Sequence, residues 1–427
     1  MSIDENWIQK IALHSPRRMS AQINSRPSSS NSGTNEELAK PELLAKLDDH
    51  VARVTDGWVL ANEDGLWTAS EDKSVRLYLR RDNDQYWPSI NHFMPVQPTC
   101  LFYCEEVHRL LVGLLNGHVF VYDVADDCNS LRQRQHFTLH AGPISGLYLS
   151  ITSELIFSSS RDKTVLWHCS ENGTRQGGAS IDSSCVCMVV AQPFIFIGDY
   201  GGNVHVLRID GSVAQHLHKL SAHTGTVTSL AWDNDRQWLF SGSADNLVII
   251  WDIGGRKGEA YELTGHKSRI TKLYYGAGKK QLFSADESGK LMIWDMSAAR
   301  IVTPAWATSD TCQLCEAPFF WNLQAMWQKK VVGQRQHHCR ICGRAVCGSC
   351  CSARTTYPPM GFEIPVRICK SCDENMKNHS ERYNLTPLAV GHDIRTGVVG
   401  LHVQELNGRM VIVGQNRSIL LYNIKNQ

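Results

Sequence analysis

An internal repeat constrains this chain more than any other feature of its sequence. The clearest copy runs from Leu220 to Ile253, and the next runs from Leu263 to Met296. Each copy holds a histidine near its start, three short alternating runs rich in β-forming residues, a polar turn and a closing Trp-Asp. Alternation with a period of two residues predicts β-strands that are buried on one face. Recurrence of such a unit predicts an architecture built from stacked or ring-arranged small sheets.

The spacing of the copies extends the repeat over most of the chain. Their closing positions recur at intervals of 44, 45, 40, 44 and 43 residues, at Tyr78, Tyr122, Trp167, Leu207, Trp251 and Trp294. A seventh ending lies at Tyr422, 128 residues further on. Subtracting one period of about 43 residues leaves an insertion of about 85 between the sixth and seventh copies. The seventh copy stops after its third run, and residues 41–50 can supply the missing outer strand.

This repeat resembles the WD-repeat family, whose unit is one four-stranded blade of a β-propeller. The resemblance implies a mainly β protein with a seven-bladed propeller that closes through that outer strand. WD blades are pinned internally by a set of polar side chains, which in copy five comprises His223, Ser241 or Ser243, Asp245 and Trp251. A Ser-His-Asp set also occurs in hydrolases. Its recurrence at the blade period, in degraded forms, indicates a structural role instead.

Two copies depart from this pattern. Copy six has Ser288 at the position of the aspartate. Copy three has one residue fewer between Asp162 and Trp167 than copy five has at the same place, which predicts a bulge or a register change.

Nine of the 15 cysteines lie between residues 312 and 372. Eight of them form four Cys-x2-Cys pairs: Cys312 and Cys315, Cys339 and Cys342, Cys347 and Cys350, and Cys369 and Cys372. Two such turns complete the tetrahedral thiolate coordination of one Zn²⁺, so the four pairs predict two zinc ions without an open position. Only four residues separate the second and third pairs, which favours an interleaved arrangement. Pairs one and three then bind one structural zinc, and pairs two and four bind the other.

Several zinc modules use such a cross-brace, including the RING fingers of ubiquitin ligases. The segment Arg335-Gln336-His337-His338-Cys339-Arg340 resembles the R(R/K)HHCR signature of the FYVE domain. Residues 306–310 resemble its WxxD motif with one extra residue, and residues 367–369 resemble its RVC motif. The Cys-x-His step of a RING finger is absent.

A FYVE-type finger inserted in a WD propeller resembles the WD-repeat and FYVE-domain-containing proteins, a family of endosomal adaptors. The resemblance implies phosphatidylinositol 3-phosphate as the ligand and early endosomes as the location. It also implies kinases or trafficking factors as partners of the propeller. The corresponding divisions are a disordered arm over residues 1–39, blades one to six over 40–300, the finger over 301–380 and blade seven over 381–427.

The candidate lipid site follows from the signature. Arginine forks match phosphate oxygens, so Arg335, Arg340 and Arg367 are expected to hold the phosphates, with His338 assisting. The resemblance implies that His337 and Asp310 hydrogen-bond the free inositol hydroxyls, and it adds Trp306 to the site. Gln336 replaces a cation that the family usually has, which predicts weaker binding.

The residues before the signature are expected to contact the membrane. Val331 and Val332 resemble the apolar turret that inserts into the bilayer, and Lys329 and Lys330 are expected to attract anionic lipid. The alternative is that the two valines form a strand in the core of the finger. Two valines give weak anchoring, which favours dimerisation or a second contact.

The remaining sequence features concern location and function class. The N-terminus lacks the apolar core of a secretory signal, and no stretch of about 18 apolar residues is present, so we expect a cytoplasmic protein peripheral to membranes. Arg17-Arg18-Met19-Ser20 resembles a basophilic kinase site, although it also fits an ordinary charged tail. The net charge of +1 argues against nucleic-acid binding. The sequence therefore predicts a non-enzymatic endosomal scaffold, with a RING-like ubiquitin-ligase subunit as the alternative.

Overall fold

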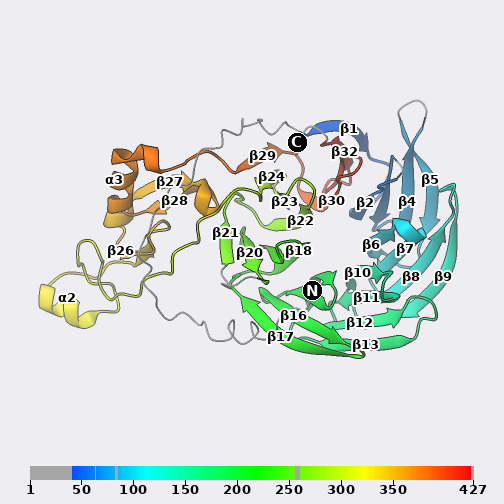
Figure 1. The fold of residues 1–427 in the computed structure, drawn as a ribbon, viewed down its shortest axis with the longest axis horizontal. Helices are drawn as coiled ribbons and strands as arrows, with labels where there is room; N and C mark the ends of the chain where they lie inside the picture. The colour runs from blue at the N-terminus through cyan, green and yellow to red at the C-terminus, as the bar shows by residue number, and fades with distance from the viewer. Residues whose placement is uncertain (1–40, 63, 82–84, 255–259, 425–427) are drawn as a thin grey trace.

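The structure is a computed structural model that describes residues 41–62, 64–81, 85–254 and 260–424. The predicted N-terminal arm and the Arg17-Arg18-Met19-Ser20 motif lie outside the described residues. Small antiparallel sheets form a ring, and a finger projects from one side of it (Figure 1). This arrangement confirms the predicted mainly β propeller with an inserted finger.

Strand order divides the ring into seven four-stranded units, which we number as blades one to seven. Blades three and four join into one eight-stranded sheet through a single parallel bridge between Gly178 and Val213. The strands of blades one to four are β2 Val54–Val59, β3 Gly65–Ser70, β4 Ser74–Arg80, β5 Tyr86–Phe93; β6 Pro98–Cys104, β7 Arg109–Leu114, β8 His118–Val124, β9 Leu131–Thr138; β10 Ile144–Ser150, β11 Leu155–Ser160, β12 Thr164–Cys169, β13 Arg175–Ser180; and β14 Cys185–Ala191, β15 Phe194–Asp199, β16 Asn203–Asp210, β17 Val213–Ser221.

Blades five to seven contain strands that are more widely separated along the chain. Their strands are β18 Val227–Asp233, β19 Trp238–Ser243, β20 Val248–Asp252, β21 Ala260–Leu263; β22 Ile270–Gly276, β23 Gln281–Asp286, β24 Lys290–Asp295, β29 Ala389–Asp393; and β30 Val398–Gln404, β31 Arg409–Gly414, β32 Ile419–Asn423, β1 Glu42–Leu47. Strand β1 pairs antiparallel with β32, as the sequence predicted for residues 41–50.

The first strands of the blades form a closed inner ring. Strands β2, β6, β10, β14, β18, β22 and β30 contact one another in this order, and β30 contacts β2. A threonine near the start of several of these strands links neighbouring blades. The Thr55 hydroxyl lies 3.0 Å from the Pro98 carbonyl oxygen of the next blade, and the Thr228 hydroxyl lies 2.7 Å from that of Ile270. Closure of the ring leaves the first strands with only short edges, which neighbouring blades protect.

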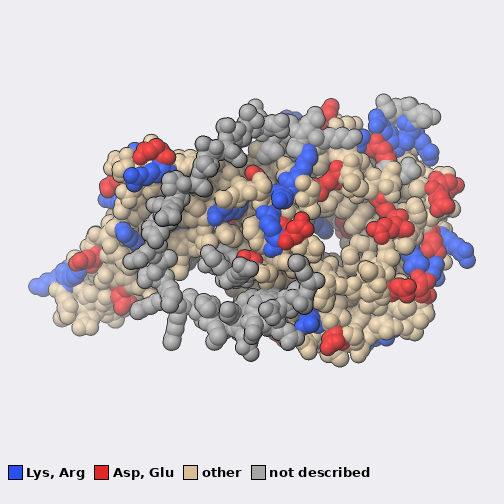
Figure 2. Space-filling view, in the orientation of Figure 1, with Lys and Arg blue, Asp and Glu red and all other residues tan. Residues whose placement is uncertain are grey.

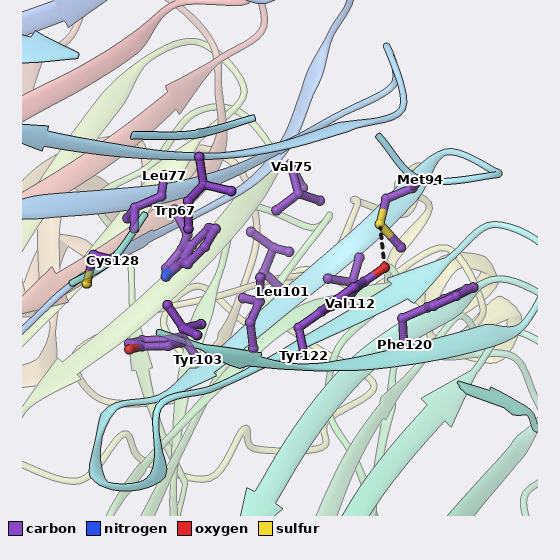
Figure 3. Packing of buried hydrophobic residues seen from close by; sticks show 14 of the residues in the cluster. Trp67, Val75, Leu77, Met94, Leu101, Tyr103, Val112, Phe120, Tyr122 and Cys128 are labelled. Carbon is purple, nitrogen blue, oxygen red and sulfur yellow. Dashed lines mark hydrogen bonds between the residues drawn. The ribbon is translucent and has the colours of Figure 1, made fainter. Parts of the chain in front are cut away.

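Apolar side chains fill the spaces between adjacent blades. Figure 3 shows this packing between blades one and two, where Trp67 and Leu77 of blade one face Tyr103 of blade two. The Tyr122 hydroxyl donates a hydrogen bond to the Met94 sulfur across the same interface, over 3.4 Å. Each blade therefore has two apolar faces, and each face is buried only because a neighbouring blade covers it.

The predicted polar set of copy five is present, and it selects Ser241 rather than Ser243. The two ring nitrogens of His223 lie 3.0 Å from Asp245 Oδ2 and 2.7 Å from Ser241 Oγ, and the Trp251 indole donates to Ser241 over 2.8 Å. The His223 side chain is fully buried. These bonds hold the blade together and leave the serine without access to a substrate.

The structure refines the reading of the repeat in two blades. In blade six, Ser288 keeps the position of the aspartate, but Asp286 supplies the carboxylate partner of His266, at 2.8 Å. In blade three, His168 rather than Trp167 occupies the closing position, because it pairs with Ile156 just as Trp251 pairs with Leu239. Trp167 therefore faces the opposite side of the blade. The register of β12 against β13 shifts between Trp167 and His168, but the equivalent strands of blades one, two and four shift at the same place, so the shift is common to these blades and does not result from a shorter copy three.

The place of the insertion also needs a correction. The sequence placed the finger between blades six and seven, but the finger lies between β24 and β29, which are hydrogen-bonded neighbours within blade six. The reason is that a sequence repeat and a blade are out of phase by one strand, so the outer strand of each blade precedes the next repeat. The finger therefore leaves and rejoins the propeller through one sheet.

The finger has little regular structure. Its elements are α2 Leu323–Lys329, β25 His337–His338, β26 Ala345–Val346, η3 Ser349–Cys351, β27 Ala353–Tyr357, η4 Pro358–Met360, β28 Phe362–Ile368, α3 Lys370–Asn378 and η5 Ser380–Arg382. It rests on the outer strand of blade five, where Thr264 forms a parallel bridge with Phe362. Gly361 permits this approach, since a Cβ there would lie 2.3 Å from the carbonyl oxygen of Glu262.

Candidate functional site

Eight cysteines of the finger gather into two sets of four. Within each set the sulfur atoms all lie within 4.8 Å of one another; the sets are Cys312, Cys315, Cys347 and Cys350, and Cys339, Cys342, Cys369 and Cys372. These are the interleaved sets that the spacing predicted. Four thiolates at such distances match the tetrahedral coordination of a structural zinc ion. The finger therefore has two structural zinc sites.

Backbone amides support the charge on these sulfurs. The amide of Cys347 donates to the Cys312 sulfur, and the amide of Cys369 donates to the Cys339 sulfur, each over 3.3 Å. Burial would raise the pKa of Cys347, but hydrogen bonds from the Ser349 hydroxyl and a backbone amide lower it overall. These contacts favour the thiolate form of the cysteines that receive them, the form in which a cysteine binds zinc.

The ninth cysteine is not part of either set. Cys351 is fully buried, and burial raises the pKa of its thiol to about 12. Its carbonyl oxygen accepts a hydrogen bond from Arg367 Nη1 over 3.1 Å. Cys351 is therefore an unreactive core thiol whose backbone helps to position a candidate phosphate ligand.

The two histidines of the signature lie on β25, which pairs with β26. The His338 Nε2 atom lies 3.1 Å from the Ala307 carbonyl oxygen, and its ring stacks on Trp306 at 4.7 Å between centroids. The Arg340 guanidinium lies over the same indole at 4.7 Å. The structure thus brings Trp306, His338 and Arg340 into one stack.

Positive charge converges on the other histidine. Burial lowers the pKa of His337, and the nearby charges of Arg367, Arg335 and Arg354 lower it further. Arg354 was not among the predicted ligands, but it lies directly opposite Arg367 in the pairing of β27 with β28. No aspartate or glutamate occurs between residues 317 and 362 of the sequence. The site around His337 is therefore suited to an anion.

Arg340 is less available than the other candidates. Its Nη1 atom is buried without a hydrogen-bond partner in the described part of the chain, and it lies 3.9 Å from Glu262 Oε2 on the outer strand of blade five. Arg335, in contrast, is exposed. Nothing in the sequence pointed to Glu262, because it lies in a different domain.

Asp310 and Gln336 lie beside this site. Asp310 Oδ1 accepts a hydrogen bond from the Trp321 indole over 2.9 Å, and no contact joins Asp310 to His337 or His338 among the described residues. The Gln336 side-chain amide lies 3.5 Å from the Ser309 carbonyl oxygen, a weak contact. The side chain of Gln336 is thus held by only a weak contact among the described residues.

The two valines before the signature are exposed. Their exposed fractions are 46% for Val331 and 74% for Val332, which contradicts the alternative of a strand in the core of the finger. Lys329 and Lys330 are exposed beside them. The Lys329 ammonium group donates a hydrogen bond to the backbone carbonyl oxygen of Glu316 over 2.9 Å.

Comparison with known proteins agrees with the fold and the zinc sites. Residues 305–378 match the FYVE zinc finger family, and residues 131–168, 214–252 and 258–295 match the WD domain, G-beta repeat family. The solved WD40 β-propeller domain of Doa1 is similar, with a TM-score of 0.58 and 14% identity, over 90% of this chain and 97% of that one. The molecule is thus a WD propeller carrying a FYVE zinc finger.

Relatives with the same combination of domains are much more similar in sequence. The chain is 56% identical over 388 residues to WD repeat and FYVE domain-containing protein 2 of Caenorhabditis briggsae, covering 91% of this chain and 93% of the relative. It is 42% identical over 408 residues to WD repeat and FYVE domain-containing protein 1 of Homo sapiens, covering 95% and 96%. The chain belongs to the family of WD repeat and FYVE domain-containing proteins. This combination of domains supports a role as a membrane-binding adaptor.

Proposed function

We propose that this protein is a non-enzymatic adaptor that binds phosphatidylinositol 3-phosphate on the cytoplasmic face of early endosomes and recruits proteins, such as kinases or trafficking factors, to its propeller. The observation that carries the proposal is the pairing of Arg354 with Arg367 across β27 and β28, together with the positive charge that they and Arg335 place near His337. Their guanidinium groups can bind a phosphate oxygen pair in a way that a lysine cannot.

The remaining roles in the proposed site follow from the same geometry. Arg335 is exposed and is the first phosphate ligand, while Arg367 is oriented by the Cys351 carbonyl oxygen. Trp306 stacks on His338 and thereby fixes the segment that carries Asp310 beside the histidines. Arg340 becomes a phosphate ligand when it moves away from Glu262.

Membrane contact completes the proposal. None of the helices in the described residues is long and apolar enough to cross a bilayer. The exposure of Val331 and Val332 supports insertion into one leaflet, with Lys329 and Lys330 near the lipid headgroups. Exposed valines and clustered arginines favour a lipid over the alternative ligand, a ubiquitin-conjugating enzyme.

Liposome sedimentation tests the phosphate site. We expect Arg335→Ala to weaken binding to vesicles containing phosphatidylinositol 3-phosphate by about tenfold to a hundredfold, because it removes a charge-assisted hydrogen bond. Arg161→Ala, which removes an exposed cation from blade three, is the matched control and should bind as the wild type does. Equal binding by both variants, or autoubiquitination with a conjugating enzyme, would contradict the proposal.

Gln336→Arg provides a gain-of-function test of the same site. The glutamine makes only one weak contact, so its replacement costs little, and the new guanidinium joins the cations around the signature. We expect affinity for phosphatidylinositol 3-phosphate to rise several-fold, within the range of one additional charged hydrogen bond. Unchanged affinity would mean that the side chain at this position does not reach the lipid phosphate.

A further inference from the structure

Helix α2 has no buried residue, although it carries a leucine, a methionine and a tryptophan. Leu323 and Trp327, which are four residues apart and so share one face of the helix, have exposed fractions of 71% and 88%. Phe320 and Trp321 just before the helix are also exposed. We use the name apolar tip for Phe320, Trp321, Leu323, Trp327, Val331 and Val332.

The apolar tip is one structural unit. Helix α2 ends at Lys329, and the next residue, Lys330, adopts a left-handed conformation with φ of 50° and turns the chain back. The Val331 amide then donates to the Met326 carbonyl oxygen over 3.2 Å, so the two valines lie beside the helix. Gly333 permits this return, because a Cβ there would lie 2.8 Å from Phe320 Cα and 2.9 Å from the Met326 sulfur.

A groove runs between the helix and the returning segment. It has a volume of about 610 Å³, and it is lined by Leu323, Met326, Trp327, Lys330, Val331 and Val332. Lys330 is the only charged residue among them. An exposed apolar surface of this extent marks a binding surface and not an ordinary protein exterior.

The position and charge of the apolar tip indicate its partner. Helix α2 lies at the end of the finger that is farthest from the propeller, so no other part of the ring limits access to it (Figure 1). The surface over α2 is mostly uncharged, with basic side chains at its end and acidic side chains beside it (Figure 2). Lys329 and Lys330 follow Trp327 after one glutamine, and Glu316, which contacts Lys329, is the last acidic residue before Glu363. Basic and aromatic residues around an apolar face are typical of interfacial helices.

We infer that helix α2 is a membrane-inserting wedge, which buries Leu323 and Trp327 in an anionic bilayer beside the two valines. The inference rests on the proposed function in that both place the same end of the finger on a membrane. It goes further because it assigns most of the non-specific membrane affinity to α2, whose burial removes more apolar surface from water than two valines do. Recognition of the phosphoinositide stays with the arginines.

Two vesicle compositions and two variants separate these contributions. The vesicles are phosphatidylcholine with phosphatidylserine, either with or without phosphatidylinositol 3-phosphate. We expect Trp327→Ala to weaken sedimentation of the full chain with both kinds of vesicle by about tenfold. Arg335→Ala should weaken binding much more where the phosphoinositide is present than where phosphatidylserine is the only anionic lipid. Trp87→Ala, which removes an exposed tryptophan from blade one, is the control and should behave as the wild type does.

A second measurement locates the tryptophan directly. Brominated lipids quench the fluorescence of indoles that enter the bilayer, so the wild type should lose more emission on binding than Trp327→Ala does, while Trp87→Ala should match the wild type. The zinc content of Trp327→Ala should stay unchanged, because no residue of α2 is buried in the finger.

The outcomes distinguish the wedge from the proposed function. If Trp327→Ala kept the affinity and the quenching of the wild type, the wedge would be overturned, even if Arg335→Ala still lost selectivity for the phosphoinositide. Loss of binding in Trp327→Ala with no selectivity for the phosphoinositide in the wild type would overturn the proposed function and leave the wedge standing. Self-association of the wild type without vesicles, abolished by Trp327→Ala while vesicle affinity is kept, would show that the face binds a second copy and would also overturn the wedge.

Discussion

The propeller and the finger are stabilised in different ways. Between blades, the buried clusters consist mainly of aliphatic and aromatic side chains, and neighbouring sheets cover one another around the ring. The buried cluster of the finger includes six cysteines. Around it, the finger has only two two-stranded sheets and short helices. A core of this kind cannot offset the entropy of ordering the chain by apolar burial alone. The propeller is therefore stabilised by burial of its own apolar surface, whereas the finger depends on its zinc ions for folding.

Loss of one zinc ligand should break this comparison most clearly. Zinc binding contributes about 10–16 kcal/mol to small zinc fingers, so Cys342→Ser should unfold most of the finger. We expect elemental analysis to show two zinc ions per chain in the wild type and at most one in the variant. Thermal unfolding of the propeller, followed by far-ultraviolet circular dichroism, should change little.

Cys351→Ser is the control for that experiment. It removes a buried cysteine of the same cluster that belongs to neither four-cysteine set, so both zinc ions should remain. A propeller that melts together with the finger in Cys342→Ser would show that the two regions form one cooperative unit.

A cavity in the core of the propeller should destabilise the propeller and leave the finger intact. Phe196 of blade four is fully buried and stacks on Trp232 of blade five, with ring centroids 4.8 Å apart. Phe196→Ala should destabilise the propeller by about 3–5 kcal/mol, because such substitutions lose apolar burial and leave a void. Zinc content and vesicle binding should be kept at temperatures below the transition. Tyr200→Ala, at an exposed position of the same blade, should leave the transition unchanged.

The same contrast explains how much the sequence could predict. A blade repeats, so even degraded copies revealed their third strands by spacing, and the closing strand β1 followed from the incomplete seventh copy. The cysteine pairs fixed the two zinc sites, because four residues between Cys342 and Cys347 leave little room for a closed site. Both inferences rest on local spacing, which a single sequence records.

What the sequence did not record was the pairing between distant segments. The finger lies within blade six because β29 returns to β24 across the whole insertion. His168 replaces Trp167 at the closing position because register, and not residue type, decides which face a side chain occupies. The spacing of Leu323 and Trp327 indicates an apolar face on α2. Only the structure shows that this face is exposed, because no residue of the helix is buried.

The smallest expected effect on stability comes from a polar contact between blades one and seven, where the ring closes. Asp64 accepts hydrogen bonds from Arg409 of blade seven, at 3.0 and 3.2 Å, and from Arg80 and Tyr86 of blade one. Burial would raise the pKa of Asp64, but these hydrogen bonds outweigh it and lower the pKa to about 2. A carboxyl group whose pKa is lowered by folding stabilises the fold at pH values above its pKa in the unfolded chain, which is near 4. That contribution is lost as the pH falls towards 2.

Asp64→Asn should therefore lower the free energy of unfolding at pH 7 by about 1–2 kcal/mol, since the group is partly exposed. The variant should also lose less stability than its parent between pH 5 and about 2.5. Urea unfolding in a Cys342→Ser background, where the finger is already disrupted, limits interference from acid release of zinc. Asp182→Asn, at an exposed ion pair with Lys219, is the control. Equal acid sensitivity with and without Asp64 would mean that the ring closes through β1 and apolar packing alone.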